Sequence, residues 1–205
     1  MLKRAAYHEA GHVVIAWYYS ISCVGVSIVK EKDSLGAAQI WELFGKVPLQ
    51  THQLERVLDI ALAGAAAEEK LIGKKIRGWG GNDYMNAVKI AAQWSEQTGK
   101  TFDNAYLVDT SIEVDQITGC LFSAAFLDEF AGNVRQLMKR THIWGCVEAV
   151  AHQLIKKTVL SSQEVIDIIS MTWEELDGDG QEAILEKQRS DSSQRPWGEW
   201  RPEMS

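Results

Sequence analysis

The sequence has few of the cysteines that a disulfide-stabilised protein or a thiolate metal site would need. Its 205 residues include only three, Cys23, Cys120 and Cys146, and no two of them have C-x-x-C spacing. An odd number of widely separated cysteines argues against both kinds of site. We therefore expect a reducing compartment, with the cytoplasm as the location, and we interpret the cysteines as packing residues.

An excess of positive charge is also missing. The chain has 21 Lys and Arg against 28 Asp and Glu, for a net charge of −7, so we expect no nucleic-acid partner. A content of 46% apolar and 24% charged residues, with only three prolines, excludes collagen-like and wholly disordered chains. The length suits one domain with a substantial core.

No hydrophobic run is long enough to cross a bilayer comfortably. The longest uncharged run, residues 13–29, has seventeen residues and includes three serines and a glycine. Two histidines and a glutamate stand just before it, which is untypical of a signal peptide. We predict no membrane span in this chain, and instead a buried helix ending near Tyr19 followed by a strand at Val24–Val29.

Helical periodicity dominates the rest of the chain and predicts a mainly α fold. One helix is expected from Thr51, as N-cap, to Gly73, and another opens at Asn82. Apolar stripes at 127–138 and 147–155 predict a packed antiparallel helix pair. A second strand at Ala37–Leu43 completes a small β-hairpin, and the capping-box pattern Ser161–Glu164 starts a last short helix.

One short segment carries metal chemistry: His8-Glu9-Ala10-Gly11-His12, an H-E-x-x-H motif. On a helix, residues i and i+4 lie one above the other, so both imidazoles can reach one tetrahedral zinc. The glutamate beside the first histidine can then act as general base. Gly11 is costly inside a helix, which predicts close packing against its backbone.

A catalytic zinc needs a third protein ligand and an open fourth position. No G-x-x-H follows His12, so the third ligand must lie farther along the chain. Asp83 is favoured because it begins a helix just after Gly80-Gly81, but spacing alone does not choose. The candidates are His52, Glu68, Glu69, Asp83, His142 and His152.

Three motifs in order resemble the peptidase domain of the FtsH family of AAA+ ATP-dependent zinc metalloproteases. They are Ala6-Tyr-His-Glu-Ala-Gly-His12, Leu62-Ala-Gly-Ala-Ala-Ala-Glu-Glu69, and Gly81-Asn-Asp83 followed by Ala87-Val-Lys-Ile-Ala91. The resemblance spans about residues 5–170 and extends through the later helices to Val159–Val165. It implies a compact helical zinc-peptidase domain with a small β-hairpin near the active site.

The resemblance also implies roles for individual residues. His8 and His12 would be zinc ligands, Asp83 the third ligand and Glu9 the catalytic base. Glu68 is similar to a family residue near the metal, and we expect it to contact a ligand rather than the ion. The implied cofactor is Zn2+, and the implied activity is endopeptidase cleavage of unfolded proteins or peptides.

The sequence departs from the family pattern in places. Ala63-Gly64-Ala65 stands where the family usually has Gly-Gly-Arg, and Gly81 stands where it usually has Ser. The family's peptidase domain follows a membrane-anchored ATPase, so this chain is either a stand-alone relative or part of a longer protein. Possible partners are a separate AAA+ ATPase or further copies of the chain, six by resemblance.

Two further expectations concern organisation and activity. We expect residues 1–176 to form the peptidase domain and 177–205 a flexible polar tail. The alternative to a peptidase is a non-catalytic FtsH-like interaction module or adaptor that keeps the fold, with or without the zinc.

Overall fold

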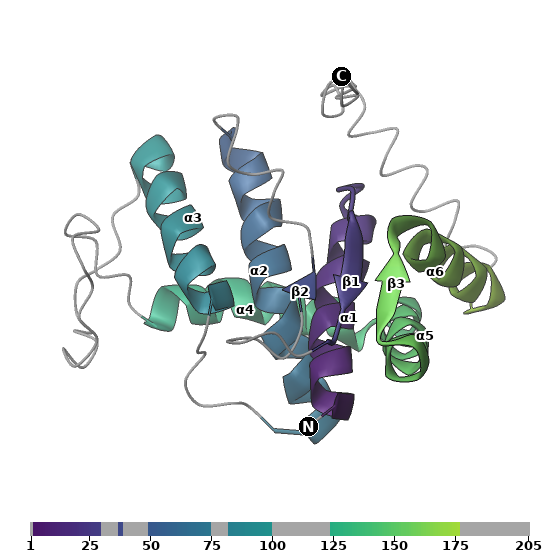
Figure 1. Cartoon of the computed structure of the whole chain (residues 1–205). Coiled ribbons are helices and arrows are strands. Elements are labelled where there is room, and N and C mark those ends of the chain that lie inside the picture. Colours follow the sequence, from purple (N-terminus) through teal and green to yellow (C-terminus); the bar gives the residue numbers. More distant parts are fainter. Residues whose placement is uncertain (1, 30–36, 39–48, 75–81, 100–123, 177–205) are drawn as a thin grey trace, which may run out of the picture.

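The computed structural model describes residues 2–29, 37–38, 49–74, 82–99 and 124–176. These residues form six helices and three short strands, which confirms the mainly α fold. Figure 1 shows α1 in the middle, α2, α3 and α4 on one side, and α5 and α6 on the other. Helix α1, which carries the H-E-x-x-H motif, is therefore covered from both sides, and this packing holds its side chains in place.

Helix α1, Leu2–Tyr18, is the core of the molecule and ends one residue before the predicted end. Its side chains from Val13 to Ala16 are completely buried. Gly11 allows α2, Thr51–Ile72, to come close: a Cβ at position 11 would lie 2.6 Å from the Ala63 carbonyl oxygen. The predicted reason for this glycine is thus confirmed.

The predicted C-terminal end of α2 is confirmed, but the predicted N-cap is wrong by one residue. Thr51 is the first helical residue and not the N-cap; Gln50 is the cap, and its backbone N–H donates to Gln53 Oε1 at 2.8 Å. The Gln53 side chain thus satisfies the free N–H of Gln50, which is the reciprocal contact of a capping box that begins at Gln50 and not at Thr51. Gly73 ends the helix as predicted, with φ 75° and its N–H on the Glu69 carbonyl at 2.9 Å.

Helices α3, Asn82–Thr98, and α4, Ala124–Lys139, both pack on α2. Helix α5, Thr141–Lys157, packs instead between α1 and α6, Ser162–Leu176. The prediction that α4 and α5 form a packed antiparallel pair is therefore wrong (Figure 1). Their stripes are apolar because each covers a different helix, and only one residue joins them.

Three short strands form an antiparallel sheet in the order β2-β1-β3. They are β1 Gly25–Ser27, β2 Ala37–Ala38 and β3 Val159–Ser161. The β1–β2 hairpin was predicted, with longer strands; β3 was not. Val26 pairs with Ala38 on one side and Leu160 on the other, so the sheet joins the two ends of the described chain.

The last helix starts as the sequence predicted. The backbone N–H of Ser161 donates to Glu164 Oε2 at 2.9 Å, and that of Glu164 donates to Ser161 Oγ at 3.3 Å. Trp173 of this helix is 1% exposed and lies against Trp17, with ring centroids 5.4 Å apart. These contacts fix α6 beside α1 and the sheet.

Some predictions lie outside the described residues: the tail 177–205, Gly81, Cys120 and the strand residues beyond Ala38. Among the helices that the structure does describe, none has the length and apolar character needed to pass through a membrane.

Candidate metal centre

Three ligand atoms from two helices converge beside α2. His8 and His12 extend from α1, and Asp83 from the first turn of α3. Asp83 Oδ2 lies 2.8 Å from His8 Nε2 and 3.4 Å from His12 Nε2, and the two Nε2 atoms are 3.1 Å apart. Within the described parts of the chain, these residues form the one cluster able to hold a metal ion.

The spacing of the three atoms fits a tetrahedral zinc site. Zinc binds imidazole nitrogen and carboxylate oxygen at about 2.0–2.2 Å, so two ligand atoms of a tetrahedron stand about 3.3 Å apart. The observed separations are 2.8, 3.1 and 3.4 Å. Small movements would admit the ion, and three ligands leave the open position that a catalytic site needs.

The hydrogen bonds on the far side of each ring favour metal binding. His12 Nδ1 lies 2.7 Å from the Ile60 carbonyl oxygen, which can only accept, so this nitrogen carries the proton. His8 Nδ1 lies 2.7 Å from Glu68 Oε1, to which it donates in the same way. In the neutral rings both Nε2 lone pairs therefore face each other and Asp83, an arrangement that requires a cation or a proton between them.

The shifted pKa values of His8 and Asp83 in the metal-free cluster likewise favour a positive charge between these side chains. Burial alone would lower the pKa of His8, but the hydrogen bonds to Asp83 and Glu68 outweigh it and raise the pKa to about 10. Burial alone would raise the pKa of Asp83, but His12 and His8 hold it well below its ordinary range. A proton on His8 thus occupies the place that a divalent cation would take.

Gly64 of α2 forms the floor of the cluster. A Cβ at this position would lie 2.4 Å from His12 Nε2 and 2.6 Å from His8 Nε2. Real side chains do not tolerate such approaches, so only glycine leaves room for both rings. The sequence showed Gly64 as the retained glycine of a changed motif, but its spatial role depends on how closely α1 and α2 approach.

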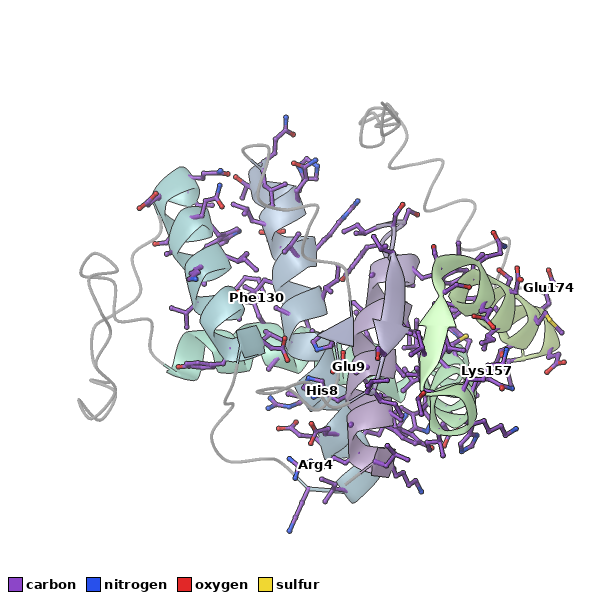
Figure 2. The ribbon with its side chains drawn as sticks, in the orientation of Figure 1. Arg4, His8, Glu9, Phe130, Lys157 and Glu174 are labelled. Carbon is purple, nitrogen blue, oxygen red and sulfur yellow. The ribbon has the colours of Figure 1, made fainter. Side chains whose placement is uncertain are left out.

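Glu9 and Glu68 both lie beside His8, but on different helices. Glu9 is 8% exposed and adjoins His8 on α1 (Figure 2). Glu68 lies on α2 and contacts His8 Nδ1 rather than the converging Nε2 atoms. Burial alone would raise the pKa of Glu68, but the hydrogen bonds from His8 and Arg4 lower it, so the carboxylate is ionised.

The remaining candidates for a third ligand have other surroundings. Glu69 pairs with Arg135, and His142 lies against the Trp173 ring with centroids 4.0 Å apart. His152 lies against Tyr7, and His52 is exposed on the first turn of α2. Of the six candidates, the structure brings only Asp83 and Glu68 to the histidine pair.

Two contributors were missed by the sequence reasoning. The Ile60 carbonyl has no sequence signal, because any residue supplies a carbonyl oxygen. Arg4 ion-pairs with Glu68, and its position four residues before His8 places both on one face of α1. That spacing was a visible signal, but it has meaning only once Glu68 is known to face the same side.

Comparison with known proteins places this chain in a family. The model of Peptidase family M41 matches residues 2–168. The chain is 29% identical over 181 residues to the ATP-dependent zinc metalloprotease FtsH 2 of Thermoanaerobacter sp. (strain X514), covering 83% of this chain and 32% of that protein. It is 25% identical over 187 residues to the ATP-dependent zinc metalloprotease FtsH of Rhodothermus marinus, covering 80% of this chain and 25% of that protein.

The Rickettsia typhi ATP-dependent zinc metalloprotease FtsH is 27% identical over 188 residues, with 82% of this chain and 29% of that protein covered. The chain thus spans about a quarter to a third of the length of these relatives. The family match extends from the first turn of α1 into α6 and includes all three converging side chains. The chain belongs to Peptidase family M41, a family of zinc metallopeptidases.

Proposed function

We propose that this chain is a zinc-dependent endopeptidase acting on unfolded polypeptides. The observation that carries the proposal is the convergence of His8, His12 and Asp83 over Gly64, with both Nδ1 atoms already used as donors. Three lone-pair atoms that face one another at these distances need a cation or a proton between them, and zinc is the cation that this set of ligands suits.

In this proposal His8 Nε2, His12 Nε2 and Asp83 Oδ2 hold the zinc. The ion, when bound, supplies Lewis acidity that activates a water molecule and polarises the peptide carbonyl. Glu68 and the Ile60 carbonyl keep the two imidazoles in the tautomer and orientation that present Nε2.

Glu9 is the proposed general base. Its carboxylate accepts a proton from the attacking water and later returns it to the nitrogen of the leaving amine. The residue immediately follows His8 on α1 and is largely shielded from solvent. That position is what the H-E-x-x-H spacing requires of the base.

The small sheet is the proposed binding surface for substrate. Strand β2 lies at one edge of the sheet and contacts α1, the helix that carries His8 and Glu9. An extended polypeptide added to this edge would bind through backbone hydrogen bonds, which depend little on its side chains. We therefore propose broad tolerance of sequence and a requirement for an unfolded chain.

The proposed partner is an AAA+ ATPase that delivers such chains, with further copies of this chain forming a homo-oligomer. The support is indirect: the relatives are named ATP-dependent proteases, and this chain matches only part of each.

The test combines metal analysis with cleavage of a casein-type unfolded protein. We expect stoichiometric zinc and zinc-dependent cleavage in the wild type. Glu9→Gln should keep its zinc but lower cleavage by at least about 100-fold, since general bases contribute that much. Glu96→Gln, the same change at an exposed position on α3, is the control and should leave cleavage unchanged.

Unchanged cleavage in Glu9→Gln would contradict the proposed mechanism. Zinc bound stoichiometrically by a wild type that cleaves nothing would favour the non-catalytic interaction module instead. Absence of zinc would contradict the proposed peptidase.

A further inference from the structure

Arg4 stands one helical turn before His8 on the same side of α1 (Figure 2). Its Nε donates a hydrogen bond to Glu68 Oε2, while His8 Nδ1 donates to Oε1 of the same carboxylate. Both oxygens of Glu68 are thus engaged by α1, one by each residue. The Glu68 side chain is 12% exposed and that of Arg4 56%, so the pair forms the solvent-facing edge of the cluster.

A carboxylate held by one hydrogen bond can rotate about its last torsion, which is broad for glutamate. A second donor on the other oxygen removes this freedom. The Arg4 contact therefore fixes the plane in which Glu68 accepts from His8. It also gives Glu68 a partner on the side away from the three converging ligand atoms.

Resting on the proposed function, we propose that Arg4 is a positioning residue for the metal centre, acting through Glu68 on the orientation of His8. Arg4 reaches the cluster through its hydrogen bond to Glu68. Its contribution is to keep Glu68 bound to Nδ1 so that His8 Nε2 stays aimed at His12 and Asp83.

A simple charge effect predicts the opposite result. A guanidinium near a divalent cation repels it, so removing Arg4 would tighten zinc binding if charge alone mattered. Removal of a positioning contact would weaken it. The sign of the change in zinc affinity therefore separates the two roles.

The experiment measures zinc affinity of the whole chain by competition with a chromophoric chelator, using zinc alone as the probe. We expect Arg4→Ala to weaken zinc binding by about fivefold, the upper end of what a half-exposed ion pair supplies. Glu68→Ala should weaken it by about 10–100-fold, as loss of a ligand's hydrogen-bond partner does. In the Glu68→Ala background, Arg4→Ala should have no further effect.

Two more variants exclude an indirect effect on folding. Arg4→Lys keeps the charge and should recover part of the affinity. Lys3→Ala removes the same charge from the neighbouring residue, which lies over the Tyr7 ring, and should leave zinc binding unchanged. The far-ultraviolet circular dichroism of the metal-free protein should show the same helical content in all of these variants, while the cobalt absorption spectrum should change only when Arg4 or Glu68 is altered.

Unchanged or tighter zinc binding in Arg4→Ala would overturn the inference, as would an equal loss when Glu68 is already absent. A wild type that binds zinc while the Arg4 variants match it contradicts this inference alone. A wild type that binds no zinc contradicts the proposed function as well.

Discussion

Gly64 lies so close to His12 that a Cβ on the glycine would stand 2.4 Å from the ring Nε2. At this position the preference of a helix for alanine over glycine conflicts with the space that the two imidazoles need. Alanine is favoured over glycine inside a helix by about 1 kcal/mol. At this position the added methyl group would occupy the space in which the two imidazoles meet.

We therefore expect Gly64→Ala to keep the helical fold and to lose zinc affinity by at least about tenfold, because displaced imidazoles no longer aim Nε2 at one point. Circular dichroism and chelator competition would measure the two effects. Gly132→Ala is the matched control: that glycine lies on α4 with open space around its α-carbon, so zinc affinity should not change. Wild-type zinc affinity in Gly64→Ala would contradict the proposed geometry.

Asp83→Asn tests the third ligand. The substitution keeps the shape of the side chain but removes the charge that His8 and His12 face at 2.8 and 3.4 Å. We expect zinc affinity to fall by more than about 100-fold, since even a ligand's hydrogen-bond partner is worth about 10–100-fold. The control Asp167→Asn, at an exposed position on α6, should leave zinc affinity unchanged. Equal affinities in the two variants would exclude Asp83 as a ligand.

The ion pair between Glu69 and Arg135 fixes α4 to α2. Arg135 Nε and Nη2 donate to Oε2 and Oε1 at 2.6 and 3.2 Å, and Glu69 is 6% exposed. Removing one partner leaves a buried charge, so Arg135→Met should lower the free energy of unfolding by about 3 kcal/mol. The double variant with Glu69→Leu should recover much of that loss, and urea unfolding would measure it. A double variant as unstable as the sum of the singles would contradict this interpretation.

Asp59 predicts a pH dependence of stability. Its Oδ2 accepts from the Tyr19 hydroxyl at 2.6 Å, and its Oδ1 has no partner among the residues that the structure describes. Burial raises the pKa of Asp59 to about 6, although the Tyr19 hydrogen bond lowers it; Glu55 raises it further. An unfolded Asp titrates near pH 4. The folded state thus holds this proton more firmly, and its stabilising contribution is full below about pH 4 and lost as pH rises through about 6.

We expect Asp59→Asn to match the wild type at pH 4 and to be more stable by up to about 3 kcal/mol at pH 8. Thermal or urea unfolding of the metal-free protein across this pH range would show it. Asp167→Asn, at an exposed position, should show no such trend. A difference that stayed constant from pH 4 to pH 8 would rule out titration of Asp59 as the cause.

Part of the site was predictable because it is local. The spacing of His8 and His12 decides that both lie on one face of a helix, and Gly11 signals the close neighbour that α2 provides. Spacing did not decide among the six candidates for a third ligand, and only the folded chain brings Asp83 of α3 to the two histidines of α1. The resemblance to a family implies Asp83 as the third ligand, and that role stays a prediction.

The parts that the sequence did not predict depend on contacts between distant segments. Strand β3 has only three residues and directly precedes α6, so it is too short to show a periodicity of its own. The prediction that α4 and α5 pack against each other was wrong because an apolar stripe shows that a helix is covered but does not show which helix covers it. In the same way, the sequence did not predict that Glu69 is buried in an ion pair, because its partner Arg135 lies 66 residues farther along the chain.

The pairing of Val26 with Leu160 has a consequence for synthesis. The helix that carries both histidines leaves the ribosome before α5 and β3, which cover it and complete the sheet. Such long-range closure is slow and leaves the early segments without their final neighbours while translation continues. The two histidines of the candidate metal centre are thus synthesised well before α5 and β3, the segments that later cover their helix.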